Sequence, residues 1–248
     1  MFSAIDPDLL VIILFSALIT GMAKTGINGL GLVSIPLMAL AFGARESTGV
    51  LLPMLIMADV YAVIYYHRSA QWKIILRILP PAIIGIGIGI VTGEMISAEQ
   101  FRLLLSAVVL TMVGLMVIRD LGKKRERIPD NWWFAWIMGL AGGFATMIGN
   151  AAGPVFAVYL LAMRLPKNSF IGTGAWFFFI LNLFKAPFHV FVWETISWTT
   201  FQYNLAALPL ILAGGWLGVR LVKLFPEKAY RWFIVITTIL SALLIILR

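Results

Sequence analysis

Two glycine-rich stretches are the parts of this sequence best suited to bind a small anion. The first covers residues 21–31 (GMAKTGINGLG) and the second covers 142–153 (GGFATMIGNAAG). Each interrupts an apolar run, so we expect one helix to end and another to begin within it. The first N–H groups of a helix are unpaired and lie at the positive end of its dipole. Two such helix ends that faced each other would hold one anion between them.

Asparagine and glycine in these stretches have separate expected roles. We expect Asn28 and Asn150 to cap the second helix of each pair, while glycine lets the backbone approach a ligand closely. The alternative is that the glycines only allow close helix packing. The candidate substrate-binding residues are Lys24, Thr25, Gly26, Asn28, Gly29, Gly31, Gly149, Asn150, Ala151 and Gly153.

Three charged residues lie inside apolar segments, where a charge is costly and should have a partner. Lys24, two residues before Gly26, is the best candidate for direct contact with the anion. Asp59 either pairs with a lysine or acts as a protonatable coupling group. Lys185 is a further candidate for coupling or gating, and the alternative is that it snorkels to the membrane surface.

His67 and His189 end corresponding apolar segments beside aromatic residues. We expect them near opposite membrane faces, too far apart to share a metal ion. An interfacial role is favoured, and pH-dependent gating is the alternative. The sequence predicts neither a metal site nor a cofactor.

The composition limits the class of protein. Of 248 residues, 61% are hydrophobic and 12% are charged, which excludes an ordinary soluble domain. The absence of Cys excludes thiolate metal sites and thiol catalysis. Neither GxSxG nor HExxH occurs, which argues against an intramembrane enzyme, and no GxxxxGK[ST] loop indicates ATP coupling. We therefore expect an all-α integral membrane protein that is not an enzyme.

Ten apolar segments position these residues, and they fall into two sets of five. One constant offset superposes Gly21 on Gly143, Asn28 on Asn150 and His67 on His189, and a slightly longer one superposes Pro80 on Pro209. We expect two repeats, each with a broken or re-entrant helix pair and three transmembrane helices, at 1–120 and 132–248, joined by a basic linker at 121–131. The expected segments are 9–23, 30–42, 50–66, 74–91, 101–118, 132–147, 155–163, 170–184, 203–219 and 229–247.

The distribution of Lys and Arg indicates that the repeats are inverted. If each broken pair returns to its own side, most of the 19 cations fall on one face of the membrane. The positive-inside rule then places the linker in the cytoplasm and both termini outside it. The net charge of +8 is explained by these loops, so no nucleic-acid partner is expected.

The pattern resembles the TauE/SafE family of sulfite and organosulfur anion exporters, also called TSUP permeases. The resemblance covers essentially the whole chain. The matching positions are Gly21, Gly26, Gly29, Gly31 and Pro36 in the first half and Gly143, Gly149, Gly153 and Pro154 in the second. It implies movement of a small sulfur-containing anion or a related carboxylate through a bacterial-type inner membrane.

The resulting hypothesis is a secondary transporter, with export as the expected direction, for sulfite, a sulfonate or a similar anion. The anion would bind at the midplane between the two broken helices, and transport would be coupled to protons or an ion gradient. An anion channel or facilitator, a carboxylate transporter and a structural membrane subunit are the alternatives.

Overall fold

The computed structural model describes residues 7–27, 29–93, 95, 97, 99–100, 132–230, 232–233 and 235–236. Over these residues the chain is almost entirely helical and forms no strand. Asn28, the expected segment 101–118, the linker 121–131 and most of the segment 229–247 lie outside the described residues.

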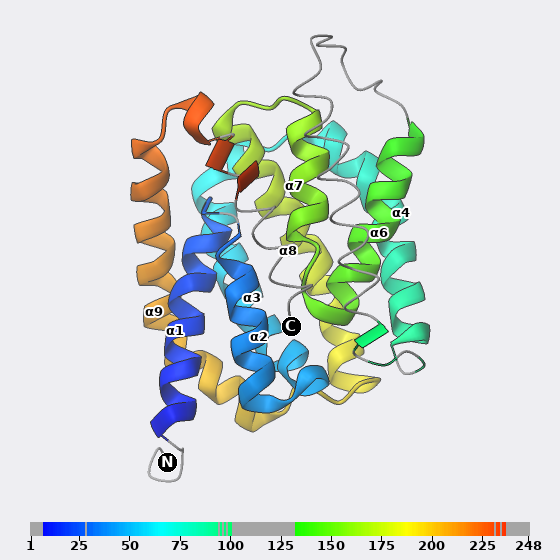
Figure 1. Ribbon diagram of the computed structural model, residues 1–248, viewed down its shortest axis with the longest axis vertical. Coiled ribbons are helices and arrows are strands. Elements are labelled where there is room, and N and C mark those ends of the chain that lie inside the picture. The colour runs from blue at the N-terminus through cyan, green and yellow to red at the C-terminus, as the bar shows by residue number, and fades with distance from the viewer. Residues whose placement is uncertain are drawn as a thin grey trace.

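The helices follow the expected apolar segments closely (Figure 1). They are α1 (Pro7–Lys24), α2 (Gly31–Phe42), α3 (Ala44–Tyr66), α4 (Trp72–Thr92), α6 (Trp132–Gly149), α7 (Gly153–Ala162), α8 (Lys167–Phe191) and α9 (Trp198–Leu224), with the 3-10 turn η1 (His67–Ser69) after α3. Among the described residues, α4, α6, α8, α9 and the stretch Arg45–Ser69 are long and apolar enough to cross a membrane.

Both glycine-rich stretches interrupt a helix, as the sequence predicts. Between α1 and α2, Gly26 and Gly29 have φ values of 131° and 100°. Residues other than glycine rarely adopt such backbone angles. Between α6 and α7, Asn150 has a φ of 54°. At 1.5 Å per residue, α2 is only about 18 Å long and α7 about 15 Å, so neither crosses a hydrocarbon core of about 30 Å.

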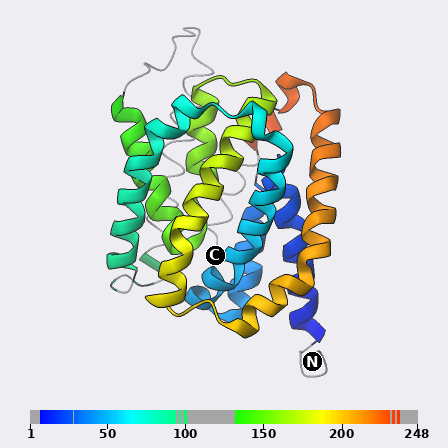
Figure 2. The same cartoon turned by 180° about the vertical axis from the view of Figure 1, so that it is seen from behind.

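The two interrupted pairs enter the molecule from opposite ends (Figure 1). α1 begins at the end where the N-terminus is marked, and α2 returns toward that end. α6 begins at the other end, and α7 returns to it. α3 and α8 pack against each other between the two pairs, as both views indicate (Figure 2).

Glycines produce two tight helix crossings with equivalent residues. A Cβ added to Gly21 on α1 would overlap the carbonyl oxygen of Ile211 on α9. A Cβ added to Gly143 on α6 would overlap the carbonyl oxygen of Ala82 on α4. The offsets that relate the two halves superpose Gly21 on Gly143 and Ala82 on Ile211. The same interface therefore occurs twice, and each copy joins a helix of one half to a helix of the other.

Among the described residues, the buried apolar side chains form two large clusters and a small third one of Ala62, Val63 and Ala175. Ile13, Met38, Met54 and Ile211 belong to one cluster that joins α1, α2, α3 and α9, which we call the first bundle. The larger cluster is centred on α4, α6, α7 and α8, which we call the second bundle. Each bundle contains helices from both predicted halves.

Large apolar side chains also cover the outside of the molecule. Phe15, Ile64, Ile88 and Leu212 are each at least 43% exposed although they lie on apolar helices. An aqueous surface would make this arrangement unfavourable, whereas lipid chains match it. The prediction of an all-α integral membrane protein is confirmed. The division at residues 120 and 131 stays a prediction.

Candidate functional site

A cavity of about 100 Å³ lies between the two helix breaks. Lys24, Gly29 and Gly31 line it from the first break, and Thr146, Asn150 and Gly153 line it from the second. The remaining wall comes mainly from apolar side chains of α2, α3, α7 and α8, among them Ile35, Leu55, Phe156 and Phe178. The cavity is therefore lined by residues of both bundles.

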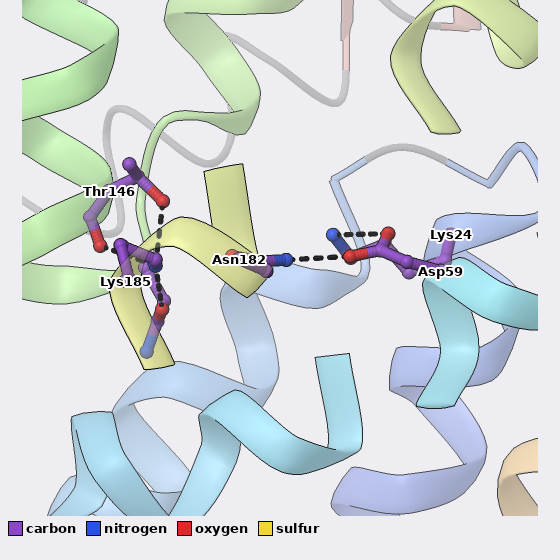
Figure 3. Close-up of polar contacts among 6 residues, drawn as sticks. Lys24, Asp59, Thr146, Asn182 and Lys185 are labelled. Atoms are coloured by element: carbon purple, nitrogen blue, oxygen red, sulfur yellow. Dashed lines mark hydrogen bonds and ion pairs between the residues drawn. The ribbon is translucent and has the colours of Figure 1, made fainter. Parts of the chain in front are cut away.

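An ion pair lies on the first-bundle side of this cavity. Lys24 Nζ lies 2.8 Å from Asp59 Oδ1, and Asn182 Nδ2 donates a 2.6 Å hydrogen bond to Asp59 Oδ2 (Figure 3). Lys24 is 13% exposed, while Asp59 is fully buried. The Lys24 ammonium also lies 4.5 Å from the ring centre of Phe178. Asp59 therefore compensates the charge of Lys24, and Lys24 also lines the cavity.

A second lysine lies behind the opposite wall. Lys185 Nζ donates to Thr146 O at 2.9 Å, Thr146 Oγ1 at 3.0 Å and Asn150 Oδ1 at 2.7 Å. Its side chain is fully buried, so it does not snorkel to a surface. Three oxygen acceptors match the three protons of an ammonium group. In the part of the chain that the structure describes, no carboxylate lies within ion-pair distance of it.

Helix α8 connects the two polar clusters. Asn182 and Lys185 lie about one turn apart on α8 and contact opposite sides of the site (Figure 3). The Asn182–Asp59 hydrogen bond crosses from the second bundle to the first. A second crossing bond runs from Asn150 Nδ2 to Thr48 O on α3 at 3.0 Å. The two bundles are thus held together beside the cavity by neutral amide donors.

The expected capping role of Asn150 is wrong. α7 begins after Ala152, and no side chain caps its first turn. The Asn150 amide group instead binds Lys185 and Thr48, because its left-handed backbone directs it toward α3 and α8. Leu30 precedes α2, again without a side-chain cap, and Asn28 lies outside the described residues.

Three backbone N–H groups at the two breaks make no hydrogen bond to another described residue. Within the described residues, the N–H groups of Gly29, Gly31 and Gly153 have no protein acceptor. By contrast, the N–H of Ala151 donates to Ala145 O at 3.3 Å. Gly29, Gly31 and Gly153 all line the cavity.

Some predicted binding residues shape the breaks without lining the described cavity. Thr25 is fully buried, and its hydroxyl group donates to Gly21 O at 3.0 Å. Tyr66 donates to Thr25 O at 3.2 Å, and Tyr230 donates to Gly26 O at 2.8 Å. Gly149 and Ala151 are buried at the second break.

The two histidines have different surroundings. His67 is exposed after α3, with Nδ1 2.9 Å from Ile64 O. His189 is fully buried near the end of α8, with Nδ1 2.9 Å from Thr195 Oγ1 and its ring 5.1 Å from Trp193. His189 is thus buried within the protein near a helix end, and its interfacial role stays a prediction. Within the described residues, no group of three or more His, Cys, Asp or Glu side chains could hold a metal ion.

Sequence reasoning left the roles of Asn182, Phe178 and Thr48 undecided or unnoticed. Asn182 has a signal in the sequence, since it is a polar residue about one helical turn before Lys185 in an apolar run. Phe178 lies in an aromatic run that resembles ordinary core. Thr48 acts through its backbone carbonyl group, for which no side-chain pattern exists.

Two interrupted helices that enter a membrane bundle from opposite ends and meet at a cavity, to which each break contributes polar residues, are typical of secondary transporters. Comparison of the sequence with protein families gives the same class. The family described as "Sulfite exporter TauE/SafE" matches residues 10–245, nearly the whole chain. The chain belongs to this family of membrane transporters. No curated protein and no solved structure matches it.

Proposed function

We propose that this protein exports a small sulfur-containing anion, such as sulfite or a sulfonate, and binds it near the middle of the membrane. The observation that carries the proposal is the cavity between the two helix breaks. Lys24 supplies a positive charge there, and Gly29, Gly31 and Gly153 supply backbone N–H donors. Such donors at helix N-termini stabilise anions, since the helix dipole adds roughly half a positive charge.

Alternating access would arise from movement of the two bundles rather than of the two sequence halves. Separating the halves would disrupt both glycine crossings, α1 with α9 and α4 with α6. Movement of one bundle against the other would keep each of these crossings within a single bundle. The bundles contact each other at the cavity, mainly through α3 and α8. The Asn182–Asp59 and Asn150–Thr48 bonds would break and re-form during the cycle.

The charged loops support an orientation in the inner membrane. Arg68, Lys73, Arg164 and Lys167 lie in or next to the connections that join α3 to α4 and α7 to α8, at the end from which α6 enters (Figure 1). We assign this end to the cytoplasm by the positive-inside rule. The N-terminus then lies on the other side.

The test is ligand binding to the purified full-length protein. Sulfite, thiosulfate, short sulfonates and carboxylates are compared by thermal shift and calorimetry. We expect at least one sulfur-containing anion to stabilise the protein. Absence of stabilisation by every anion in the panel would contradict the proposed site.

A paired substitution separates binding from folding. Lys24→Gln with Asp59→Asn removes both charges but keeps a polar pair, whereas Lys24→Gln alone would leave a buried carboxylate without its cation. We expect the double variant to remain folded and to bind anions at least about tenfold more weakly. Unchanged affinity would exclude Lys24 as a ligand. Counterflow in liposomes then distinguishes a carrier from a channel, which would not show it.

A further inference from the structure

We propose that Lys167 and Glu227 form a gate that closes the cavity on the cytoplasmic side. The inference rests on the proposed function, in which the two bundles move against each other, and it names the side chains that must separate to admit an anion from the cytoplasm. Lys167 begins α8 in the second bundle, and Glu227 lies just after the end of α9 in the first bundle. Both helix ends lie at the end of the molecule that we assign to the cytoplasm (Figure 1).

The side chain of Lys167 caps the end of α9. Its Nζ donates to the carbonyl oxygens of Val222 at 3.0 Å and Phe225 at 2.6 Å. Carbonyl groups at the end of a helix lack intrahelical donors and lie at the negative end of the dipole, where a cation is stabilising. One charged side chain of the second bundle therefore binds two acceptors of the first.

Glu227 makes the reciprocal contact at the start of α8. Its Oε2 accepts a hydrogen bond from the backbone N–H of Lys167 at 2.9 Å, and the preceding residue, Pro166, supplies no side-chain cap. A carboxylate is favourable here, because the first N–H groups of a helix are unpaired and lie at its positive end. Each helix end is thus capped by a charged side chain from the other bundle, and the bundles cannot separate here without losing both caps.

An apolar contact connects these caps to the cavity. Ile171, about one turn after Lys167 on α8, lines the cavity. A Cβ added to Gly26 at the first break would lie 2.7 Å from Val222 Cγ2 and 2.8 Å from Ile171 Cδ1, so Gly26 packs against both helix ends. Because the Val222 carbonyl group also accepts from Lys167, loss of that bond would loosen the contact that covers the first break.

A second apolar contact lies at the same end. Phe170 lines the cavity, and its ring packs edge-on against Tyr230 with 6.1 Å between ring centres. The Tyr230 hydroxyl group donates to Gly26 O at 2.8 Å. Val222 and Tyr230 belong to the larger apolar cluster, which is centred on the second bundle. Movement of the segment that carries Glu227 away from α8 would therefore also open the contact between Tyr230 and Phe170.

The two caps are suited to repeated opening. Glu227 is exposed and Lys167 is only half-buried, so water can solvate both groups when the bundles separate. The buried pair of Lys24 and Asp59 lies within the first bundle and stays together during this movement. Opening of the gate therefore leaves no buried charge without its partner.

The test measures access to the cavity from each side of the membrane. The sequence has no Cys, so Ala175→Cys, at a buried position that lines the cavity, gives a parent protein with one reactive site. The probe is sulfonatoethyl methanethiosulfonate, an anionic thiol reagent that does not cross lipid. It is added to the full chain in inside-out and in right-side-out vesicles. Labelling of the parent from the side that bears Lys167 should be slow, because the gate is closed.

Lys167→Gln removes the cation that holds the two carbonyl groups. We expect it to raise the labelling rate from the Lys167 side at least about tenfold, since a charge-assisted hydrogen bond contributes about that factor. Loss of a cation would by itself slow an anionic reagent, so a faster rate reports opening of the gate. The rate from the opposite side should not rise. An unchanged rate on the Lys167 side, or equal increases on both sides, would overturn the proposal.

Three further variants test which feature of the gate matters. Lys167→Arg keeps a cationic donor, so we expect labelling close to the parent rate, and a rate as high as that of Lys167→Gln would contradict the role of the charged donor. Glu227→Gln keeps an acceptor but removes the charge, for which we expect a smaller increase of about threefold. Lys228→Gln removes an exposed cation next to Glu227 and is the matched control, with the parent rate.

Folding and anion binding are measured on the same proteins. Size-exclusion profiles and thermal melts identify any variant that fails to fold, and the conservative changes Lys167→Arg and Glu227→Gln keep the gate testable in that case. If wild-type protein binds no anion from the panel, the proposed function fails, while the labelling rates still test the gate. If anions bind but no folded variant is labelled faster from the Lys167 side, the gate proposal alone fails.

Discussion

The two helix breaks occupy equivalent positions in the chain but are stabilised in different ways. At the first break, Gly26 and Gly29 adopt positive φ values that depend on the lack of a side chain. At the second break, Asn150 adopts a φ of 54° and its side chain binds both Lys185 and Thr48. The first break is therefore encoded in the backbone, and the second depends on a side-chain network. Substitutions should affect them differently.

The largest expected effect comes from breaking the charge pair at the first break. Asp59→Ala leaves the Lys24 ammonium group without its carboxylate, so we expect a loss of about 3–5 kcal/mol in unfolding free energy. Lys24→Met added to Asp59→Ala should recover more than half of this loss. The measurement is chemical unfolding in detergent micelles. Equal instability of the single and double variants would show that Asp59 stabilises the protein by another route.

A smaller but still large effect is expected for Gly26→Ala. The φ of 131° is unfavourable for alanine, and the new Cβ would lie 2.7 Å from Val222 Cγ2 and 2.8 Å from Ile171 Cδ1. We expect a loss of about 1–3 kcal/mol from backbone strain alone. The same unfolding assay measures it. Wild-type stability would contradict a break encoded in the backbone.

Asn150→Gly tests whether the second break depends on its side chain, because it keeps the backbone angle and removes the side chain. Glycine tolerates the left-handed backbone but removes the acceptor for Lys185 and the donor to Thr48. We expect a loss of about 1–2 kcal/mol, because buried partners are left unsatisfied. Hydrogen exchange should increase near residues 146–153 while exchange near 24–31 stays unchanged. Equal increases at both breaks would contradict their independence.

The smallest effect on folding is expected for Gly153→Ala. A Cβ at this position meets no atom within 4 Å, whereas a Cβ at its counterpart Gly31 would lie 3.3 Å from Ala23 Cβ. We expect Gly153→Ala to change stability by less than about 0.5 kcal/mol. Its methyl group should nevertheless occupy cavity space and weaken anion binding in calorimetry. Unchanged binding would indicate that the anion does not approach the start of α7.

Local sequence patterns predicted the elements of the fold well. The apolar runs and glycine-rich stretches predicted the helices and both interruptions, because these depend on neighbouring residues. Burial of Asp59 and partial burial of Lys24 followed from their position in apolar segments, whereas the sequence left open whether Lys185 is buried or snorkels to the surface. The choice of partner did not follow, since Asp59 and Lys24 are brought together only by the packing of α1 on α3.

The role of Asn150 shows why the rest of the site could not be predicted. An asparagine after a glycine at a helix start fits a cap, a left-handed turn or a tertiary contact equally well. Only the position of Lys185 on α8 decides among these alternatives. Asn28, its counterpart, lies outside the described residues, so its expected role stays a prediction.

The exchange of helices between the two bundles has a consequence for biosynthesis. α1 packs its glycine face on α9, and α4 packs closely on α6. Until the later helices leave the ribosome, the earlier ones lack these packing partners. The chain can therefore complete its native packing only late in synthesis, and a fragment that ends after α4 would lack the surfaces needed to assemble correctly.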